Sequence, residues 1–314
     1  MPGTLARPDD RPRKRGLLAD LLRCWQLYVL VAPTIIYLFI FNYIPMYGMQ
    51  IAFRDFIANR GVWGSQWVGI KHFRYFFTSP QFAALIGNTI KLSVYSLLWS
   101  FPFPILLALM LNEARRLWFK KLIQNLTYIP YFISVVVLVS MVNLFLAQGD
   151  GLINQAITAL GGQAIDFLGK ERYFRTIYIA SGVWQGMGWS SIIYLAALSN
   201  VDIQLHEAAQ IDGATRLQRV WHINIPCILP TAIILFILSS GHIMTIGFEK
   251  VYLLQNTLNT AISEVISTYV YKTGLLNVKY SYTAAIGLFN NVINILILLT
   301  VNKLSQKLSD ISLF

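Results

Sequence analysis

Cysteine, histidine and acidic side chains are scarce in this chain of 314 residues. It has two cysteines and four histidines, and its 14 aspartates and glutamates are outnumbered by 25 lysines and arginines. Cys24 and Cys227 are far apart in the sequence and take part in no metal-ligand spacing. The sequence therefore predicts neither a disulfide framework nor a metal site.

Motifs for nucleotide binding and catalysis are also absent. A phosphate-binding G-x4-G-K-[ST] loop does not occur, because Gly64 and Gly69 are followed by Ile70 where the loop requires lysine. H-E-x-x-H, C-x-x-C and G-x-S-x-G are missing as well, and acidic residues lie almost wholly outside the apolar runs. We predict that the chain binds no cofactor, does not bind ATP itself and is not an enzyme.

Charge is low and apolar content is high. Only 12% of residues are charged and 56% are hydrophobic, with a mean hydropathy of +0.55, whereas soluble domains have about a quarter of their residues charged. This composition indicates a polytopic membrane protein. The net charge of +11 would suggest a nucleic-acid partner in a soluble protein, but basic loops on one side of a membrane explain it more simply, so no nucleic acid is expected.

Six apolar runs are long enough to cross a bilayer, which requires about 20 residues each. They cover residues 25–48, 86–111, 122–146, 175–199, 226–248 and 281–302. We therefore predict an all-α fold with six transmembrane helices over residues 25–302, preceded by a basic tail, 1–24, and followed by a short tail, 303–314.

The distribution of lysine and arginine predicts the orientation. Six basic residues precede the first run and four follow the second run within a short loop. Both segments should be cytoplasmic, which also places the N-terminus, residues 202–226 and the C-terminal tail on that side. The longer segments 49–85, 147–174 and 249–280 then face outward, although they still contain nine basic residues.

The polar segment 202–226 lies between the fourth and fifth runs and is patterned as a helix-turn-helix. Asp202 can cap a first short helix, Asp212-Gly213 interrupts it, and Pro226 marks entry into the next span. Its residues Glu207-Ala208-Ala209, then Gly213, then Ile223-Asn224-Ile225-Pro226 fit the pattern E-A-A-x3-G-x9-I-x-L-P except for Ile225. The segment therefore resembles the EAA loop of permease subunits of binding-protein-dependent ABC importers.

That resemblance implies the architecture of a type I ABC importer permease in a bacterial inner membrane. It implies that segment 202–226 docks on a dimer of ATP-binding subunits, which would hold the ATP and Mg²⁺. It also implies a second permease subunit, which we expect to be a related chain, and an external solute-binding protein. The residues that would couple to the ATPase are Glu207, Ala208, Ala209, Asp212, Gly213, Arg216 and Pro226.

The segment WVGIKHFRYFFTSPQFAALIGNTI, residues 67–90, resembles carbohydrate-type permeases of the same family. The chain also resembles the polysaccharide branch of these permeases, which includes permeases for alginate oligosaccharides. Basic residues in the loops predicted to face outward would suit an acidic sugar. A neutral oligosaccharide and a modified peptide or sugar remain alternatives. A secondary transporter and a membrane-embedded enzyme are more distant ones.

Polar residues inside the predicted spans are candidates for a substrate path, although such residues more often join helices. The candidates are Lys91, Asn143, Gln185, His242, Asn290 and Asn294. In the fifth run, Ser239, His242, Thr245 and Glu249 recur at helical spacing. The outward stretch 257–274 has an apolar helical stripe and is expected to lie on the membrane surface or to form a docking face.

Overall fold

The structure is a computed structural model that describes residues 25–309 and 311–313. The predicted basic tail, 1–24, lies outside the described residues. The chain divides into two units, residues 1–50 and 51–314. In the first unit, α2 (Trp25–Leu38) passes into a π-helical turn (Phe39–Tyr43) and α3 (Ile44–Met46), and a 3-10 helix (Tyr47–Phe53) continues the run across the boundary.

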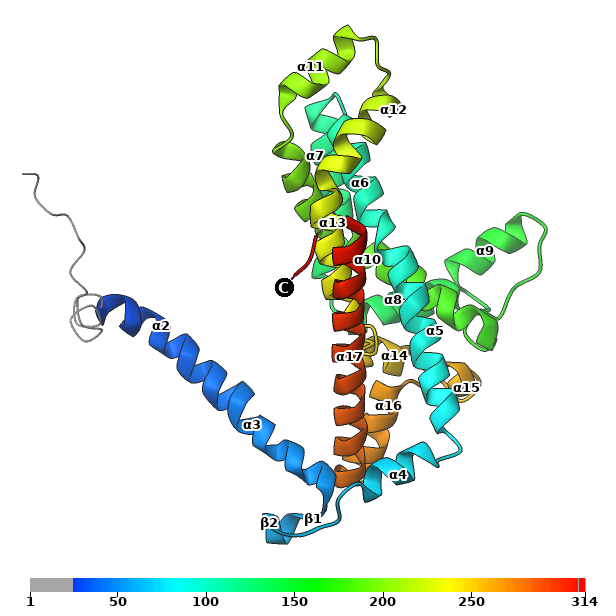
Figure 1. The fold of residues 1–314 in the computed structure, drawn as a ribbon. Helices are drawn as coiled ribbons and strands as arrows, with labels where there is room; N and C mark the ends of the chain where they lie inside the picture. Colours follow the sequence, from blue (N-terminus) through cyan, green and yellow to red (C-terminus); the bar gives the residue numbers. More distant parts are fainter. Residues whose placement is uncertain (1–24, 310, 314) are drawn as a thin grey trace, which may run out of the picture. The chain divides into compact units, whose positions relative to one another are not determined.

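Long helices dominate the second unit (Figure 1). The second predicted span is α5 (Phe82–Ser100) followed directly by α6 (Pro102–Glu113), and the fourth is α10 (Glu171–Ser199). The sixth is α17 (Tyr280–Ser309), which extends seven residues past the predicted end at 302. The prediction of an all-α membrane protein is confirmed, with one small β-hairpin added.

Within residues 25–309 and 311–313, four helical runs are long and apolar enough to cross a membrane: Trp25–Phe53, Phe82–Glu113, Arg216–Ser240 and Tyr280–Ser309. A bent pair of helices makes a fifth candidate. At about 1.5 Å per residue, the 29 residues of α10 are also long enough to span, but they are too polar for hydropathy alone to identify a span. Six spans are consistent with these helices.

The third predicted span, 122–146, is not one straight helix. A run comprising α7 (Leu117–Tyr128) and a 3-10 turn (Ile129–Phe132) meets α8 (Val135–Leu146) at a bend of 104°. Pro130 lies in the 3-10 turn, and Ser134 caps α8 by accepting a hydrogen bond from the Val137 amide. Proline removes a backbone donor and favours such a break, so the apolar run 122–146 forms a bent pair of helices.

The fifth predicted span, 226–248, is shifted toward the N-terminus. Helix begins at α12 (Arg216–Arg219), continues through a π-helical turn (Val220–Asn224) and ends with α13 (Ile225–Ser240). Residues 241–244 form turns and 245–247 have no regular structure, so Ser239, His242, Thr245 and Glu249 do not share a helical face. The apolar pattern continues past Ser240, but the helix ends there. The segment that follows is held by hydrogen bonds between Asn294 and residues Met244 and Thr245.

Short elements form the segments predicted to face outward. Strands β1 (Arg54–Ile57) and β2 (Gly61–Trp67) pair antiparallel around a 3-10 turn (Ala58–Arg60), and α4 (Lys71–Phe77) follows. The later segments contain α9 (Leu152–Ala159), α14 (Phe248–Leu254), α15 (Thr260–Ser263), α16 (Ile266–Val270) and a π-helical turn (Tyr271–Leu276).

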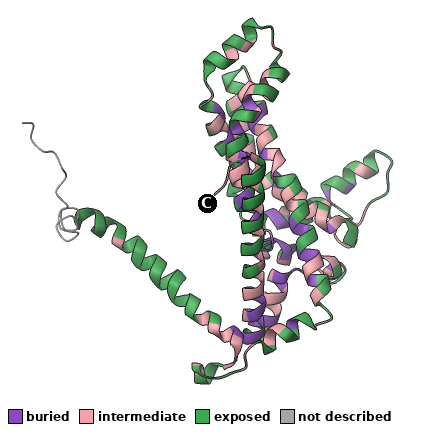
Figure 2. Cartoon of the chain, in the orientation of Figure 1, coloured by how far each residue is buried: buried purple, intermediate pink, exposed green. Residues whose placement is uncertain are grey.

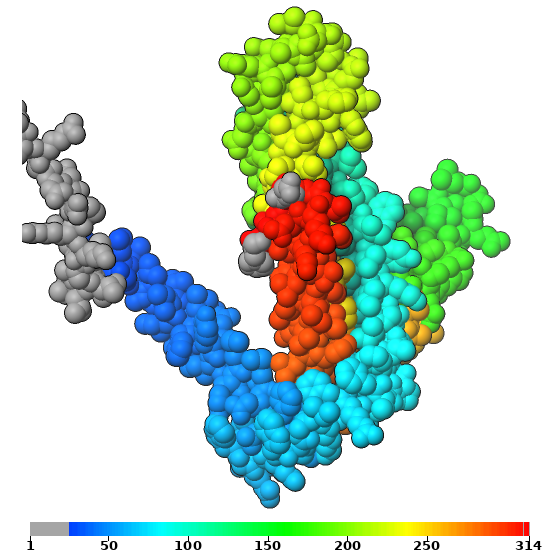
Figure 3. All heavy atoms as spheres, viewed as in Figure 1, coloured from blue at the N-terminus to red at the C-terminus, as the bar shows by residue number. Residues whose placement is uncertain are grey.

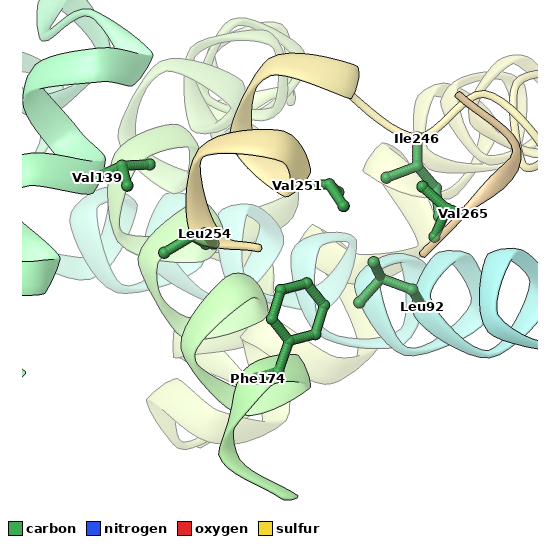
Figure 4. Packing of buried hydrophobic residues seen from close by; sticks show 7 residues of the cluster. All are labelled: Leu92, Val139, Phe174, Ile246, Val251, Leu254 and Val265. Atoms are coloured by element: carbon green, nitrogen blue, oxygen red, sulfur yellow. The ribbon is translucent and has the colours of Figure 1, made fainter. Parts of the chain in front are cut away.

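A hydrophobic cluster joins these short elements to the long helices. Figure 4 shows its members, Leu92, Val139, Phe174, Ile246, Val251, Leu254 and Val265. Val265 and its neighbour Ile266 are buried, and α15 and α16 are separate helices. The apolar residues of stretch 257–274, expected to lie on the membrane surface or to form a docking face, therefore do not share one exposed helical face. Leu258 is exposed, whereas Val265 and Ile266 pack into the core.

Candidate functional site: an exposed helical hairpin and a polar cavity

Segment 202–226 folds as a helix, a tight turn and a second helix. The first helix is α11 (Ile203–Ile211), and the Asp202 carboxylate caps it by accepting a hydrogen bond from the Gln204 amide at 2.9 Å. This is the cap that the sequence predicts, and it satisfies one of the free amides at the helix start. Glu207, Ala208 and Ala209 lie on the second half of α11.

Gly213 makes the turn possible. Its φ is +79°, in the left-handed region that glycine adopts without strain. The Ala214 amide donates to the Ala209 carbonyl at 2.8 Å, and the Gly213 amide donates to the Gln210 carbonyl at 3.1 Å. These bonds close the C-terminus of α11 in the manner of a glycine cap, so the glycine of the motif has a backbone role.

The second helix starts with a capping box and continues without interruption into the membrane. Thr215 caps α12, and Gln218 reciprocates by accepting from the Thr215 amide at 2.7 Å. Because the helix runs on through Val220–Asn224 into α13, Pro226 lies near the start of α13 rather than at a break. α12 and α13 are therefore parts of one helical run.

Two residues to which the sequence analysis gave no role, Asn224 and Glu113, connect this hairpin to α6. Asn224 is fully buried, and its amide nitrogen donates to Glu113 at the end of α6 over 3.4 Å. A polar residue in the otherwise apolar run Ile223 to Ile225 was the signal that could have identified it.

Several large apolar side chains are exposed on the surface of the hairpin. No residue of α11 is buried, and Ile211, Leu217 and Trp221 expose 86%, 76% and 66% of their surfaces. Figure 2 shows α11 without buried residues, and the yellow-green atoms of this region form one end of unit 51–314 in Figure 3. Glu207, Asp212 and Arg216 are exposed beside these side chains. The exposed surface of the hairpin therefore carries both large apolar and charged side chains.

A cavity of about 740 Å³ lies between α5, α10 and α13. Hydroxyl groups converge on it from all three helices: Ser93, Ser96 and Ser100 from α5, Ser190 from α10, and Ser239 from α13. Ser93 Oγ is buried and has no hydrogen-bond partner among the described residues. The cavity thus offers several hydrogen-bonding groups to a polar guest.

Aromatic rings and a histidine complete the lining of this cavity. Trp189 lines it and stacks on Tyr131, with ring centroids 4.8 Å apart and planes at 6°. His242 and Thr245 line it from the turn after α13. A small-molecule site typically has apolar and aromatic walls with a limited number of polar groups that point into it.

Of the six path residues predicted from the sequence, only His242 lines this cavity. Asn294 is buried on α17 and clamps the turn, accepting from the Met244 amide and donating to Thr245 Oγ1, both at 2.9 Å. Gln185 donates to the Ile133 carbonyl at 2.9 Å, at the break before α8. These two amides join segments of the fold.

The remaining three predicted residues lie apart from one another. Lys91 is exposed on α5, and Asn143 is exposed on α8. Asn290 lies on α17 with a buried Oδ1 that has no partner among the described residues. Ser239 and Thr245, which the sequence analysis named in the fifth run, also line the cavity. The serines of α5 and α10 were missed because serine is common in membrane helices, and tertiary packing decides which helix faces each of them.

Charges in the segments predicted to face outward are partly neutralised internally. Asp55 lies 2.6 Å from Lys71 Nζ and 3.0 Å from His72 Nε2, and the hydrogen bond from Lys71 lowers the pKa of the Asp55 carboxyl. Lys272 forms an ion pair with Glu264 at 2.9 Å. Arg74 is exposed on α4. Groups of three or more potential metal ligands do not occur within residues 25–309 and 311–313.

Comparison with known proteins agrees with this geometry. The family described as "Binding-protein-dependent transport system inner membrane component" matches residues 100–310. The polygalacturonan/rhamnogalacturonan transport system permease protein YteP of Bacillus subtilis (strain 168) is 44% identical over 300 residues, covering 96% of this chain and 94% of the relative. Protein LplB of the same organism is 41% identical over 297 residues, covering 95% and 93%.

Two solved structures are also similar. A chain of a bacterial ABC transporter involved in the import of the acidic polysaccharide alginate aligns with a TM-score of 0.86 and 41% identity, covering 93% of this chain and 99% of that one. In the alginate transporter bound to an alginate pentasaccharide-loaded periplasmic protein, the TM-score is 0.87 and the identity 40%, covering 95% and 99%. The chain belongs to the family of inner-membrane components of binding-protein-dependent transport systems.

Proposed function

We propose that this chain is a permease subunit of an ABC importer that translocates an acidic oligosaccharide across a bacterial inner membrane. Two of the similar proteins are named for the transport of acidic polysaccharides, polygalacturonan and alginate. The observation that carries the proposal is the cavity between α5, α10 and α13, where serine hydroxyls from three helices surround an aromatic wall.

The cavity chemistry suits a sugar. Sugar hydroxyls donate and accept hydrogen bonds, and the serine hydroxyls, Thr245 and His242 offer partners of the same kind. Trp189 is held by its stack on Tyr131 and supplies a rigid apolar surface for the C–H face of a sugar ring. At about 740 Å³, the cavity falls within the 300–1,000 Å³ range of ligand pockets.

The hairpin 202–226 is proposed to transmit the work of ATP hydrolysis. A dimer of ATP-binding subunits would hold ATP and Mg²⁺ and receive α11 in a surface groove, as short helices dock in other complexes. The exposed apolar residues of α11 and α12 would be covered in that contact, with Glu207 and Arg216 at its edge. Asn224 and Glu113 would pass the motion to α6, and the α12 to α13 run would pass it to the cavity wall.

The complete importer would contain a second permease, which we expect to be a related chain, and a solute-binding protein on the outer side. In this assembly the chain itself performs no chemistry and its N-terminus is cytoplasmic. Alternating access would open the cavity first to one side and then to the other as the coupling hairpin moves.

Transport by the reconstituted importer tests the substrate. Uptake of a galacturonate oligosaccharide would be compared with that of a neutral oligosaccharide of equal length, each delivered by the cognate solute-binding protein. We expect faster uptake of the acidic sugar. Equal or faster uptake of the neutral sugar would assign the chain to neutral oligosaccharides instead.

The exposed Arg74 permits a second comparison. If outward cations guide an acidic sugar or its carrier, Arg74→Glu should slow uptake most at low ionic strength, because exposed charges are screened over about 10 Å at 0.1 M salt. Lys71 is a poorer choice because Asp55 already pairs with it. Lys71→Gln serves as the control, and an Arg74→Glu effect independent of salt would argue against electrostatic guidance.

A further inference from the structure

Two apolar grooves flank one ridge of α10. Thr176, Ala180 and Trp184 recur at four-residue steps and line both grooves. The first groove, about 720 Å³, has its other wall on α5 and α6, including Trp99 and Phe103. The second groove, about 640 Å³, has its other wall on α8, α9 and the segment between α9 and α10. Neither belongs to the serine-lined cavity.

An arginine pair lies at the end of these grooves where α10 begins. Arg172 and Arg175 both line the first groove, while Tyr173 between them lines the second. Arg172 Nη2 donates to the Tyr173 hydroxyl at 2.5 Å, and its guanidinium lies 4.6 Å from the centre of that ring. The cationic end is therefore adjacent to both grooves.

Neither guanidinium is neutralised within the described part of the chain. Arg175 donates from Nη2 to Asn88 Oδ1 at 3.3 Å, and its Nε is buried without a hydrogen-bond partner. Among residues 25–309 and 311–313 no carboxylate forms an ion pair with either arginine. A buried donor without a partner is costly, so this end of the grooves is chemically incomplete without an anion.

We propose that the ridge and its arginine pair bind a diacyl phospholipid with an anionic headgroup. The phosphate lies against Arg172 and Arg175, and one acyl chain occupies the groove on each side of Thr176, Ala180 and Trp184. Arginine suits phosphate because its planar fork donates two parallel hydrogen bonds. Tyr173, which contacts Arg172, is of the residue type that forms the aromatic belt of a membrane interface.

The first groove is longer than one leaflet is deep. Its lining on α10 extends from Arg172 to Met187, and these 15 steps correspond to about 22 Å of helix at about 1.5 Å per residue. One leaflet is about 15 Å deep, half of the roughly 30 Å hydrocarbon core. An acyl chain that starts at the arginines therefore finds apolar walls along its whole length.

A protein helix is a poorer match to the same surface. The first span of a second copy of this chain, residues 25–48, contains no aspartate or glutamate and would leave both arginines unpaired. A single protein helix is about 10 Å wide and would rest on the ridge formed by Thr176, Ala180 and Trp184. The two acyl chains of one lipid, in contrast, fill the grooves on either side of that ridge.

Native mass spectrometry of the purified full-length chain tests the proposal. Phosphatidylglycerol and phosphatidylcholine with identical acyl chains would be added in equal amounts. We expect about tenfold preferential retention of phosphatidylglycerol, since tenfold corresponds to about 1.4 kcal/mol. The preference should disappear in Arg172→Gln/Arg175→Gln and persist in Arg172→Lys/Arg175→Lys.

The matched control is Arg74→Gln/Lys170→Gln, which removes two exposed basic side chains outside both grooves. Equal retention of the two lipids by the unmodified protein, or an equal loss of preference in the control, would overturn the proposal. If the double glutamine variant does not elute as a single species, Arg172→Gln alone gives the same comparison, because that side chain is exposed. A photo-crosslinker at Trp184 in the assembled importer should capture lipid, and capture of a polypeptide would assign the grooves to a protein partner.

Discussion

Reversing the charge of Glu207 is the sharpest test of the coupling hairpin. Glu207 is exposed on α11 and forms no ion pair within residues 25–309 and 311–313. Glu207→Lys should therefore change the free energy of unfolding of the isolated chain by no more than about 0.5 kcal/mol, as is usual for exposed sites. Any larger effect on transport must then arise in a contact with another subunit.

The expected magnitude follows from the burial of that contact. Removing or reversing one partner of a charge pair that becomes buried in an interface costs about 2–5 kcal/mol. At about 1.4 kcal/mol per factor of ten, this weakens association with the ATP-binding subunit by about 30-fold or more. Ile203 and Ile211, about one helical turn before and after Glu207, are exposed and would desolvate the pair on docking.

The assay measures binding of the ATP-binding subunit to the permease in lipid nanodiscs, together with substrate-stimulated ATP hydrolysis and uptake in vesicles. Asp150→Lys is the control, because Asp150 is also exposed but lies in segment 147–174, on the side predicted to face outward. We expect Glu207→Lys to reduce ATPase binding and uptake while Asp150→Lys leaves ATPase binding unchanged. Full association and uptake by the Glu207→Lys variant would show that α11 is not the transmission element.

Three further measurements follow from the structure. Gly213→Ala should destabilise the hairpin by about 1–2 kcal/mol through left-handed backbone strain alone, since a Cβ there meets no atom within 4 Å; hydrogen exchange of α11 should rise, less so in Gly213→Asn, and unchanged exchange would contradict the turn. In a background lacking Cys24 and Cys227, Ser190→Cys and Ser239→Cys should react with a hydrophilic thiol reagent in a nucleotide-dependent manner, whereas Asn294→Cys should be protected; uniform protection of all three would remove the cavity from the path. Because Lys71 lowers the pKa of Asp55, the Asp55–Lys71 pair stabilises the fold fully at pH values above the unfolded carboxyl pKa of about 3.9. This stabilisation is lost as the pH falls through the lowered pKa of Asp55. Lys71→Gln should raise the Asp55 pKa measured by NMR, and an unchanged pKa would refute the pairing.

Local sequence patterns determined much of the hairpin. The Asp202 cap, the interruption at Asp212-Gly213 and the helix that follows depend on side chains and backbone preferences within a few residues of one another. Such interactions can be inferred without knowledge of the rest of the fold. The apolar runs likewise determined the membrane class, because bilayer thickness sets a minimum length for any spanning helix.

Only the tertiary structure decided which polar residues face one another. Asn294 and Gln185 are polar residues within apolar runs, as expected of path residues. Their side-chain amides instead form hydrogen bonds with the Met244 amide, the Thr245 hydroxyl and the Ile133 carbonyl, which are 49 to 52 residues away in sequence. The serine-lined cavity arises because α5, α10 and α13 meet at particular rotations about their axes. Helical periodicity identifies the faces of one helix, whereas the partner of each face depends on packing among distant segments, and that information is absent from any short stretch of the chain.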